Sequence, residues 1–516
     1  MVLITAVFLP IILGALLLCV PFKLDFKGQC IYTGISLCIS AVVIVMAVIM
    51  GAAAGPIDVL GLNSTLVINF SIDNLGKLFA IVMMIVWVCA GFFSFEYMKH
   101  ESNTKRYFGM YVLVLGILMG LCFSGNLVTY YTFYEFMTIG TFAMVLHNQS
   151  HEAVMAGLKY MFYSFAGAYM VLFGLYFVHQ YAIDPSMTFV NGGIIDTAKA
   201  ASSGVLNMVS EPYSGVMMVA MLLMILGFSV KAGMFPMHGW LPTAHPVAPA
   251  PASAVLSAII VKSGVLGIIR VIYYVFGINI FNGSYVQKVL LILSLTTVFM
   301  GSMLAFREKV LKKRLAYSTV SQVSYILFGV FAINATAFQG ALLHVAAHAA
   351  IKSTLFLCAG AIIYITGVTK VDELRGIGRK MPVMLWCYTI VSLGLIGIPP
   401  FGGFTSKWYL GIGAMESGIP VFRWLGPVIL LVSALLTAGY LLPLTINGFL
   451  PGNTFEDEAN SIEVIEGETF KNEELRVKYA AYIKAHEPKL MMLIPIIILT
   501  VLSIIVGLFP EVVLWV

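Results

Sequence analysis

Continuous apolar stretches recur along the whole chain and constrain its fold more than any other feature. They run to about 20 residues, the length of a helix that crosses a hydrocarbon core of roughly 30 Å. Of the 516 residues, 60% are hydrophobic and only 10% are charged, which is too little charge to cover a soluble protein of this size. Because the stretches are continuous rather than alternating, they predict transmembrane helices and not the strands of a membrane barrel.

The apolar stretches divide into about fourteen expected spans, so we predict an all-α polytopic membrane protein. The first seven spans cover residues 2–21, 29–51, 75–98, 107–126, 128–146, 155–181 and 214–236. The second seven cover residues 249–276, 286–306, 313–333, 338–366, 383–413, 424–449 and 489–514.

The Lys and Arg residues between the spans are distributed unevenly over the two sides of the membrane. Nineteen fall on one side, which we call the lysine-rich face, and three fall on the other. Such an excess marks the cytoplasmic side, so both chain ends are expected on the outer side. The lysine-rich face carries Lys23, Lys27, Lys99, Lys105, Arg106, Arg307, Lys309, Lys312, Lys313, Arg314, Lys370, Arg375, Arg379, Lys380, Lys471, Arg476, Lys478, Lys484 and Lys489, and the opposite face carries Lys199, Lys288 and Arg423.

The connection at residues 450–488 combines an acidic stretch with a basic one. Its acidic residues are Glu456, Asp457, Glu458, Glu463, Glu466 and Glu468. Two interpretations stay open for it. It is either a solvated cytoplasmic loop or a docking surface for a partner subunit.

Three cationic residues near span ends have an ordinary explanation. Lys77 and Arg270 lie where a long side chain can reach the headgroups. Lys159 lies about one turn into its span, so it either reaches the headgroups or is buried.

Four further lysines, Lys231, Lys262, Lys352 and Lys407, lie within or beside long apolar stretches. A lysine at the middle of the bilayer costs about 2.5–3.5 kcal/mol, so each needs water, a partner or neutralisation. Glu135 is the one acidic residue deep in an expected span. A structural ion pair with Glu135 explains one of these lysines and leaves three unexplained.

Lysine suits proton transfer inside a membrane because burial favours its neutral form and a nearby carboxylate favours its charged form. A Glu–Lys pair whose separation changes therefore acts as a proton switch. Histidine can bridge the intervals, since imidazole titrates near neutral pH. His344, His348 and Lys352 follow one another at intervals of four residues, which predicts one polar stripe on a helix beside a hydrated path.

Two segments rich in Pro and Gly interrupt the expected helices. One reads FPMHGWLPTAHPVAPAP over residues 235–251 and contains His238, an additional candidate, and the other reads GIPPFGGFTSK over residues 397–407. Lys231 precedes the first and Lys407 ends the second. Unwound backbone at membrane depth survives only inside protein or beside water, and corresponding breaks in two halves are typical of inverted-repeat transporters. The first segment can instead be a loop outside the membrane.

With these motifs the chain resembles a family of antiporter-like, ion-translocating membrane subunits. The family is shared by the membrane arm of respiratory complex I (NADH dehydrogenase), Mrp-type Na⁺/H⁺ antiporters and membrane-bound hydrogenases. The resemblance covers nearly the whole chain and is strongest from about residue 107 to 413. It is carried by KAGMFPMHGWLPTAHPVAPAPASA from Lys231, continuing to Lys262-Ser-Gly, by RLAYSTVSQ from Arg314, and by GIPPFGGFTSK from Gly397.

The resemblance implies fourteen helices, with two inverted five-helix repeats formed by helices 4–8 and 9–13 and with helices 7 and 12 interrupted. The implied divisions are residues 1–106 (helices 1–3), 107–276 (first repeat), 286–449 (second repeat), 450–488 (cytoplasmic loop) and 489–516 (last helix).

The resemblance also implies a role for each buried polar residue. Glu135 matches the glutamate of helix 5, and Lys231 matches its lysine partner on helix 7. Lys262 matches the central lysine of helix 8, and Lys407 matches the terminal residue of helix 12, where some members carry glutamate. His344, His348 and Lys352 match the polar stripe of helix 11.

The function implied is proton translocation, or Na⁺/H⁺ exchange, along this chain of residues. The protein would be a multi-pass subunit of a redox-driven complex in the inner membrane of a prokaryote. Its partners would be further antiporter-like and small membrane subunits, a redox arm and the lipid bilayer, with no nucleic acid.

We expect no cofactor, no metal and no redox chemistry in the chain itself. It has no flavin, nucleotide or cluster motif, and its seven cysteines form no CxxC pair. The owner of such a subunit, a dehydrogenase, a hydrogenase or a stand-alone Mrp antiporter, stays open. A secondary transporter of a small solute is a further alternative, although a row of lysines without a solute pocket fits it less well.

Overall fold

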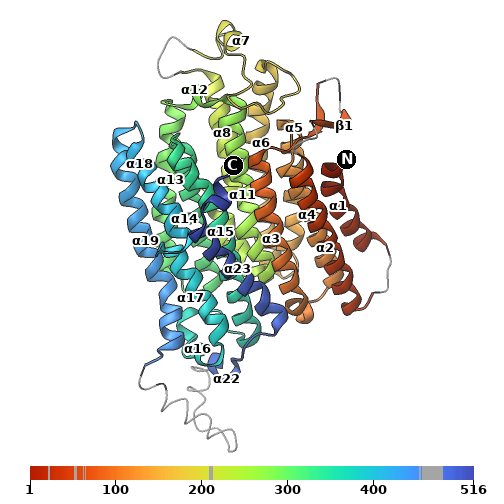
Figure 1. The fold of residues 1–516 in the computed structure, drawn as a ribbon, viewed down its shortest axis with the longest axis vertical. Coiled ribbons are helices and arrows are strands. Elements are labelled where there is room, and N and C mark those ends of the chain that lie inside the picture. The colour runs from red at the N-terminus through yellow and green to blue at the C-terminus, as the bar shows by residue number, and fades with distance from the viewer. Residues whose placement is uncertain are drawn as a thin grey trace, which may run out of the picture.

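The protein is an upright bundle of long helices joined by connections at both ends (Figure 1). The computed structural model describes residues 1–20, 24–51, 55–61, 63, 65–207, 213–452, 455 and 480–515. The acidic stretch from Glu456 to Glu468 lies outside the described residues, so its two interpretations stay open.

The first fifth of the chain, up to Tyr97, forms three membrane-length helices and a small hairpin. The helices are α1 (Val2–Cys19), α2 (Phe26–Met50) and α3 (Asn74–Tyr97), and the strands are β1 (Ile57–Gly61) and β2 (Val67–Phe70), which pair antiparallel. The carboxylates of Asp25 and Asp73 cap α2 and α3 by accepting the amide hydrogens of Gly28 and Gly76.

The middle of the chain contains the first interrupted helix. Its membrane-embedded elements are α4 (Thr104–Cys122), α5 (Leu127–Val145), α6 (His151–Tyr181), α8 (Val216–Ala232), η3 (Met237–Trp240), α9 (Leu241–Val247), α10 (Ala250–Val255) and α11 (Val261–Ile269). Two π-helical segments, η4 (Leu256–Ile260) and η5 (Arg270–Phe276), flank α11. The short helices α7 (Thr197–Ser202) and α12 (Ile278–Phe281) lie at one end of the bundle.

The last part of the chain contains the second interrupted helix. Its long elements are α13 (Tyr285–Arg307), α14 (Leu311–Phe331), α15 (Ala335–Thr366), α17 (Pro382–Ile396), α18 (Gly402–Glu416), α19 (Pro420–Phe449) and α23 (Leu490–Leu508). Four short elements complete this last part of the described chain: η6 (Val371–Glu373), α16 (Ile377–Lys380), α22 (Ala480–Lys484) and α24 (Glu511–Leu514).

The predicted all-α membrane fold is confirmed. Within the described ranges, 11 helices are long and apolar enough to cross a membrane. The three other predicted spans coincide with α5, α14 and the α17–α18 pair. The number of fourteen crossings stays a prediction.

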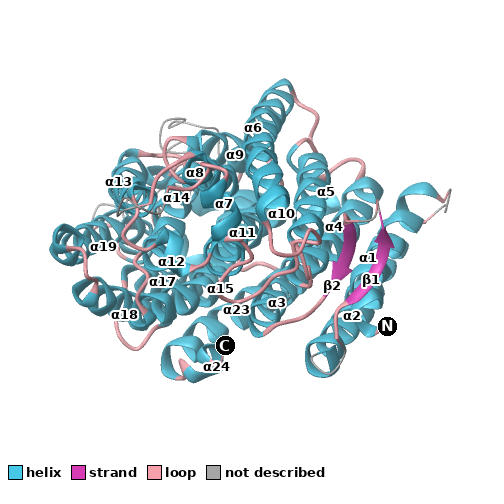
Figure 2. Ribbon diagram, turned by 90° about the horizontal axis from the view of Figure 1, so that it is seen from above, coloured by secondary structure: helices cyan, strands magenta, loops and turns pink. Residues whose placement is uncertain are grey.

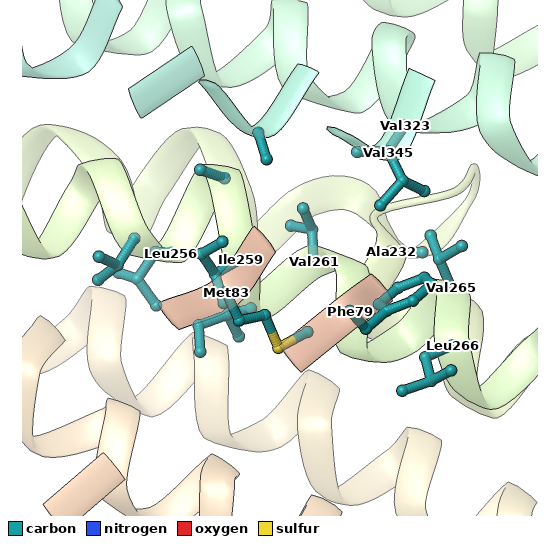
Figure 3. Packing of buried hydrophobic residues seen from close by; sticks show 14 of the residues in the cluster. Phe79, Met83, Ala232, Leu256, Ile259, Val261, Val265, Leu266, Val323 and Val345 are labelled. Atoms are coloured by element: carbon teal, nitrogen blue, oxygen red, sulfur yellow. The ribbon is translucent and has the colours of Figure 1, made fainter. Parts of the chain in front are cut away.

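One continuous helical segment, residues 250–276, forms the centre of the bundle. The 18-residue apolar window within this segment is completely buried, and its Leu256 and Ile259 lie beside Met83 of α3 (Figure 3). Seen along the bundle, α11 and α15 lie in the interior, whereas α2, α6 and α19 lie at the periphery (Figure 2). Polar groups on α11 and α15 are therefore screened from lipid.

Candidate functional site

Lys231 lies in the last turn of α8, directly before the first interruption, and its side chain is fully buried. The ammonium donates to the Tyr160 hydroxyl at 2.5 Å and to Ser164 Oγ at 2.8 Å, both on α6. The Tyr160 hydroxyl in turn lies 2.6 Å from Thr141 Oγ1 on α5. The lysine is thus solvated by hydroxyl groups rather than by headgroups.

Glu135 lies on α5 and is half-buried. Its Oε1 is buried without a hydrogen-bond partner among the described residues. Lys231 instead donates to hydroxyl groups, and in the described part of the chain no ion pair joins it to Glu135. The structure therefore holds the two charges apart, with a free carboxylate oxygen on the glutamate.

The first interruption lies inside the bundle, not in an external loop. After Ala232 the chain turns at Gly233, whose φ of +76° favours glycine, and then continues through η3 and α9. Trp240 and Leu241 are fully buried there, and the indole nitrogen of Trp240 donates to the Val230 carbonyl at 2.8 Å. This bond satisfies a backbone acceptor near the end of α8.

Lys262 lies on α11 at the centre of the protein, between the two π-helical segments. π-Helical turns are rare and occur frequently at functional sites. The Lys262 ammonium lies 2.5 Å from His348 Nδ1 on α15, and both side chains are buried. A proton can pass directly between these two nitrogens.

The row of contacts continues from His348 along α15 to α18. The rings of His348 and His344 stack with centroids 5.7 Å apart, and His344 Nδ1 lies 2.8 Å from Ser406 Oγ. Ser406 precedes Lys407 near the start of α18. Each group can donate and accept a proton, which makes the row suitable for stepwise transfer.

Lys407 is held at the second interruption. Its ammonium donates to the carbonyls of Leu395 at 2.6 Å and Ile396 at 2.9 Å, the last residues of α17. The C-terminal end of a helix carries partial negative charge, so the end of α17 stabilises the ammonium group. A Cβ at Gly403 would lie 1.8 Å from the Gly394 carbonyl oxygen, so the two half-helices meet only because glycine is present.

Three sequence candidates lie outside this row of contacts. Lys352 is fully buried on α15 and donates to the Leu315 carbonyl at 3.1 Å. Lys159 is exposed on α6, and half-buried His238 stacks on Phe235 with centroids 6.0 Å apart. In the described part of the chain, no hydrogen bond or ion pair joins any of the three to Lys231, Lys262 or Lys407.

The expectation for Arg270 was wrong. Its side chain does not reach the headgroups but is buried, with its Nη1 2.5 Å and its Nη2 2.8 Å from the carboxylate oxygens of Asp73. Desolvating an arginine is tolerated when a bidentate carboxylate satisfies it. Asp73 is 197 positions away in sequence, so local context could not reveal the pair.

Sequence reasoning also missed Tyr160, Ser164 and Ser406, the hydroxyl groups that contact the relay. Ser406 could have been found, because it adjoins Lys407 within the second Pro/Gly segment. Tyr160 and Ser164 could not, because their spacing on α6 resembles that of ordinary core residues.

Comparisons with known proteins agree with this architecture. The family model described as NADH:quinone oxidoreductase/Mrp antiporter, TM, matches residues 124–439. A second, described as NADH-Ubiquinone oxidoreductase (complex I), chain 5 N-terminus, matches residues 62–108.

Two curated relatives and one solved structure are similar over most of the chain. NADH-quinone oxidoreductase subunit N of Desulforudis audaxviator (strain MP104C) is 30% identical over 75% of this chain and 73% of the relative. A Na(+)/H(+) antiporter subunit of Bacillus subtilis (strain 168) is 25% identical over 73% of this chain and 72% of the relative. A chain of the Mrp complex from Dietzia sp. DQ12-45-1b has a TM-score of 0.80 at 21% identity, covering 99% of this chain and 94% of that chain.

Proposed function

The chain belongs to the NADH:quinone oxidoreductase/Mrp antiporter membrane family and is an ion-translocating membrane subunit, and we propose that the ion is the proton. The proton would move from Lys231 to Lys262, then through His348, His344 and Ser406 to Lys407. The observation that carries this proposal is the contact between Lys262 and His348, 2.5 Å long and buried at the centre of the protein.

Glu135 sets the proton affinity of Lys231 in this scheme. When the Glu135 carboxylate is close, it raises the proton affinity of Lys231. When the carboxylate moves away, the proton affinity of the lysine falls. The free Oε1 of Glu135 and the hydroxyl groups around Lys231 support a pair that changes its separation. Lys352 and His238 are auxiliary sites, because each needs bridging water to exchange protons with the row from Lys231 to Lys407. Lys159 is exposed and is the weakest candidate for a role in proton transfer.

The lysine-rich face is cytoplasmic in this proposal, with both chain ends on the outer side of a prokaryotic inner membrane. The proton is taken up near Lys231 and released on the outer side from Lys407. Residues 107–276 and 286–449 form the two inverted repeats, and the interruptions after Ala232 and Ile396 support this division. Partners are further membrane subunits and a redox arm that drives the transfer.

Na⁺/H⁺ exchange within a stand-alone Mrp-type antiporter is the second candidate. Similarity to a subunit of a Na(+)/H(+) antiporter favours it. Sodium prefers several oxygen ligands, whereas the row contains nitrogen donors apart from Ser406. Imposing a sodium gradient on vesicles and following internal pH separates the two candidates, because a sodium-driven pH change requires exchange.

The decisive experiment replaces Glu135 or Lys231 with Ala in the assembled complex. Both variants should assemble in the membrane but lose proton pumping, measured as acidification in inverted vesicles. Lys77→Ala is the matched control, because Lys77 is partly exposed and contacts Asn74 rather than the row. Full pumping by both test variants would overturn the proposal.

A further inference from the structure

A second row of buried polar groups lies between α14 and α19, away from Lys231. It begins at Arg314, whose Nη1 donates to the Tyr440 carbonyl at 3.0 Å. Ser318 Oγ lies 2.7 Å from the Tyr440 hydroxyl, which donates to Thr437 Oγ1 at 3.2 Å. We call this row the α14–α19 seam, formed by Ser318, Ser321, Gln322 and Tyr325 of α14 and by Ser433, Thr437 and Tyr440 of α19.

The inner part of the seam contains a cluster of three serines. Ser433 Oγ lies 2.6 Å from Ser302 Oγ of α13 and 3.3 Å from Ser321 Oγ. The Tyr325 hydroxyl donates to the Leu430 carbonyl at 2.8 Å. All of these hydroxyl-bearing residues are fully buried.

The seam ends at the proposed relay. The Tyr325 ring lies 5.1 Å from the Lys407 ammonium and stacks on His344 with centroids 5.6 Å apart. From Arg314 to Tyr325 the helix rises about 16 Å, roughly half of a 30 Å hydrocarbon core. The seam therefore reaches from the lysine-rich face to the middle of the membrane.

Gln322 indicates that the seam holds more than protein atoms. It is fully buried, and its amide faces the Tyr440 hydroxyl, but neither its amide nitrogen nor its amide oxygen makes a hydrogen bond of good geometry with any described residue. Leaving a buried polar group unpaired costs about 1–3 kcal/mol, and internal water is the usual partner for such a group. Hydrogen bonds between helices explain the paired serines but leave the open amide of Gln322 unexplained.

We propose that the α14–α19 seam is a water-containing path that connects the lysine-rich face directly to Lys407. The path does not pass through Lys231 or Lys262, and protons move along it over the hydroxyl groups and the water at Gln322. It supplies protons to Lys407, whereas net pumping still requires the relay through Lys262, so loss of either route slows pumping. Lys407 can then exchange protons with the lysine-rich face as well as with the relay. This inference rests on the proposed role of Lys407, but the hydration of the seam can be tested without it.

Silver ion, a small water-borne reagent that binds thiols, tests the hydration. In the assembled complex with its seven native cysteines replaced, Gln322→Cys and Ser433→Cys each place one thiol in the seam. Ser294→Cys is the matched control, since Ser294 is equally buried on α13 and, among the described residues, its hydroxyl donates only to the Leu291 carbonyl of its own helix. Silver added at the lysine-rich face should modify the seam thiols at least about tenfold faster than the control, because thiol reactivity follows access. Equal rates at all three positions would overturn the proposal.

Proton transfer tests the path itself. Tyr440→Phe removes one hydroxyl and keeps the ring, and it should slow proton transfer by about 100-fold, as expected for a lost proton-transfer group. Ser294→Ala should leave the rate unchanged. Unchanged transfer in Tyr440→Phe together with loss in Lys262→Met would overturn the path and keep the proposed function. Unchanged transfer in Lys262→Met would overturn the proposed function, whereas the silver result would still decide whether the seam is hydrated.

Discussion

Replacing Lys262 with Met separates a functional lysine from a structural one. The side chains have similar length, but Met removes the ammonium that lies 2.5 Å from His348 Nδ1. Removing a lysine from mid-membrane recovers about 2.5–3.5 kcal/mol, whereas leaving His348 Nδ1 without its partner costs about 1–3 kcal/mol. The net change in the free energy of unfolding is therefore expected between about 0.5 kcal/mol of destabilisation and about 2.5 kcal/mol of stabilisation.

Transport should behave in the opposite way. Without the ammonium, the central step from Lys262 to His348 has no donor, so proton pumping should fall by at least about 100-fold, the lower bound for a lost acid–base group. Thermal unfolding in detergent and acidification of inverted vesicles measure the two effects on the same preparation. A variant that pumps normally, or one that is destabilised by more than about 0.5 kcal/mol, would refute the reasoning, because either result makes the lysine unnecessary or structural.

Three further substitutions test individual contacts. Gly403→Ala should destabilise the protein by about 3 kcal/mol in thermal unfolding, because its Cβ would lie 1.8 Å from the Gly394 carbonyl oxygen; Gly411→Ala on the same helix has open space and should show no loss. Asp73→Asn should lower the free energy of unfolding by about 3–5 kcal/mol, because it leaves Arg270 as an unpaired buried charge. The double variant Asp73→Leu/Arg270→Met should recover most of this loss. An unchanged unfolding midpoint in the single variant would contradict this. Ser406→Ala should slow pumping about 100-fold while assembly on native gels stays normal. Ser353→Ala, whose hydroxyl bonds only to the Ala349 carbonyl, is its control, and equal rates would remove Ser406 from the relay.

The helices and their interruptions follow directly from the sequence. Apolar length fixes where a chain can cross a membrane, and the Pro/Gly segments at 235–251 and 397–407 mark where hydrogen bonding along a helix must stop. The spacing of His344 and His348 placed them on one face of α15, as the structure shows. These features are local, so they can be read from neighbouring residues.

Contacts between distant segments could not be predicted in the same way. The pairing of Lys262 with His348 spans 86 positions, and the pairing of Arg270 with Asp73 spans 197. Both depend on how α11 and η5 pack against α15 and α3, which sequence periodicity does not specify. The π-helical segments beside Lys262 also have no local signal, because they arise from packing of a segment buried on all sides.

The family resemblance supplied the roles of the buried lysines, and the structure adds their environment. Lys231 is solvated by Tyr160 and Ser164, and Lys407 by two helix-end carbonyls. Both cations lie beside an interrupted helix. The interrupted helices thus place hydroxyl and carbonyl groups around buried charges at a depth where lipid offers no hydrogen-bond partners.

The most direct measurement is a structure of the assembled complex in lipid, at a resolution that shows ordered water. The account predicts water between Lys231 and Lys262, where no direct contact joins them in the described residues, and predicts that Lys407 stays on the carbonyls of Leu395 and Ile396. Dry apolar packing between Lys231 and Lys262, or lysine side chains turned toward the headgroups, would contradict it.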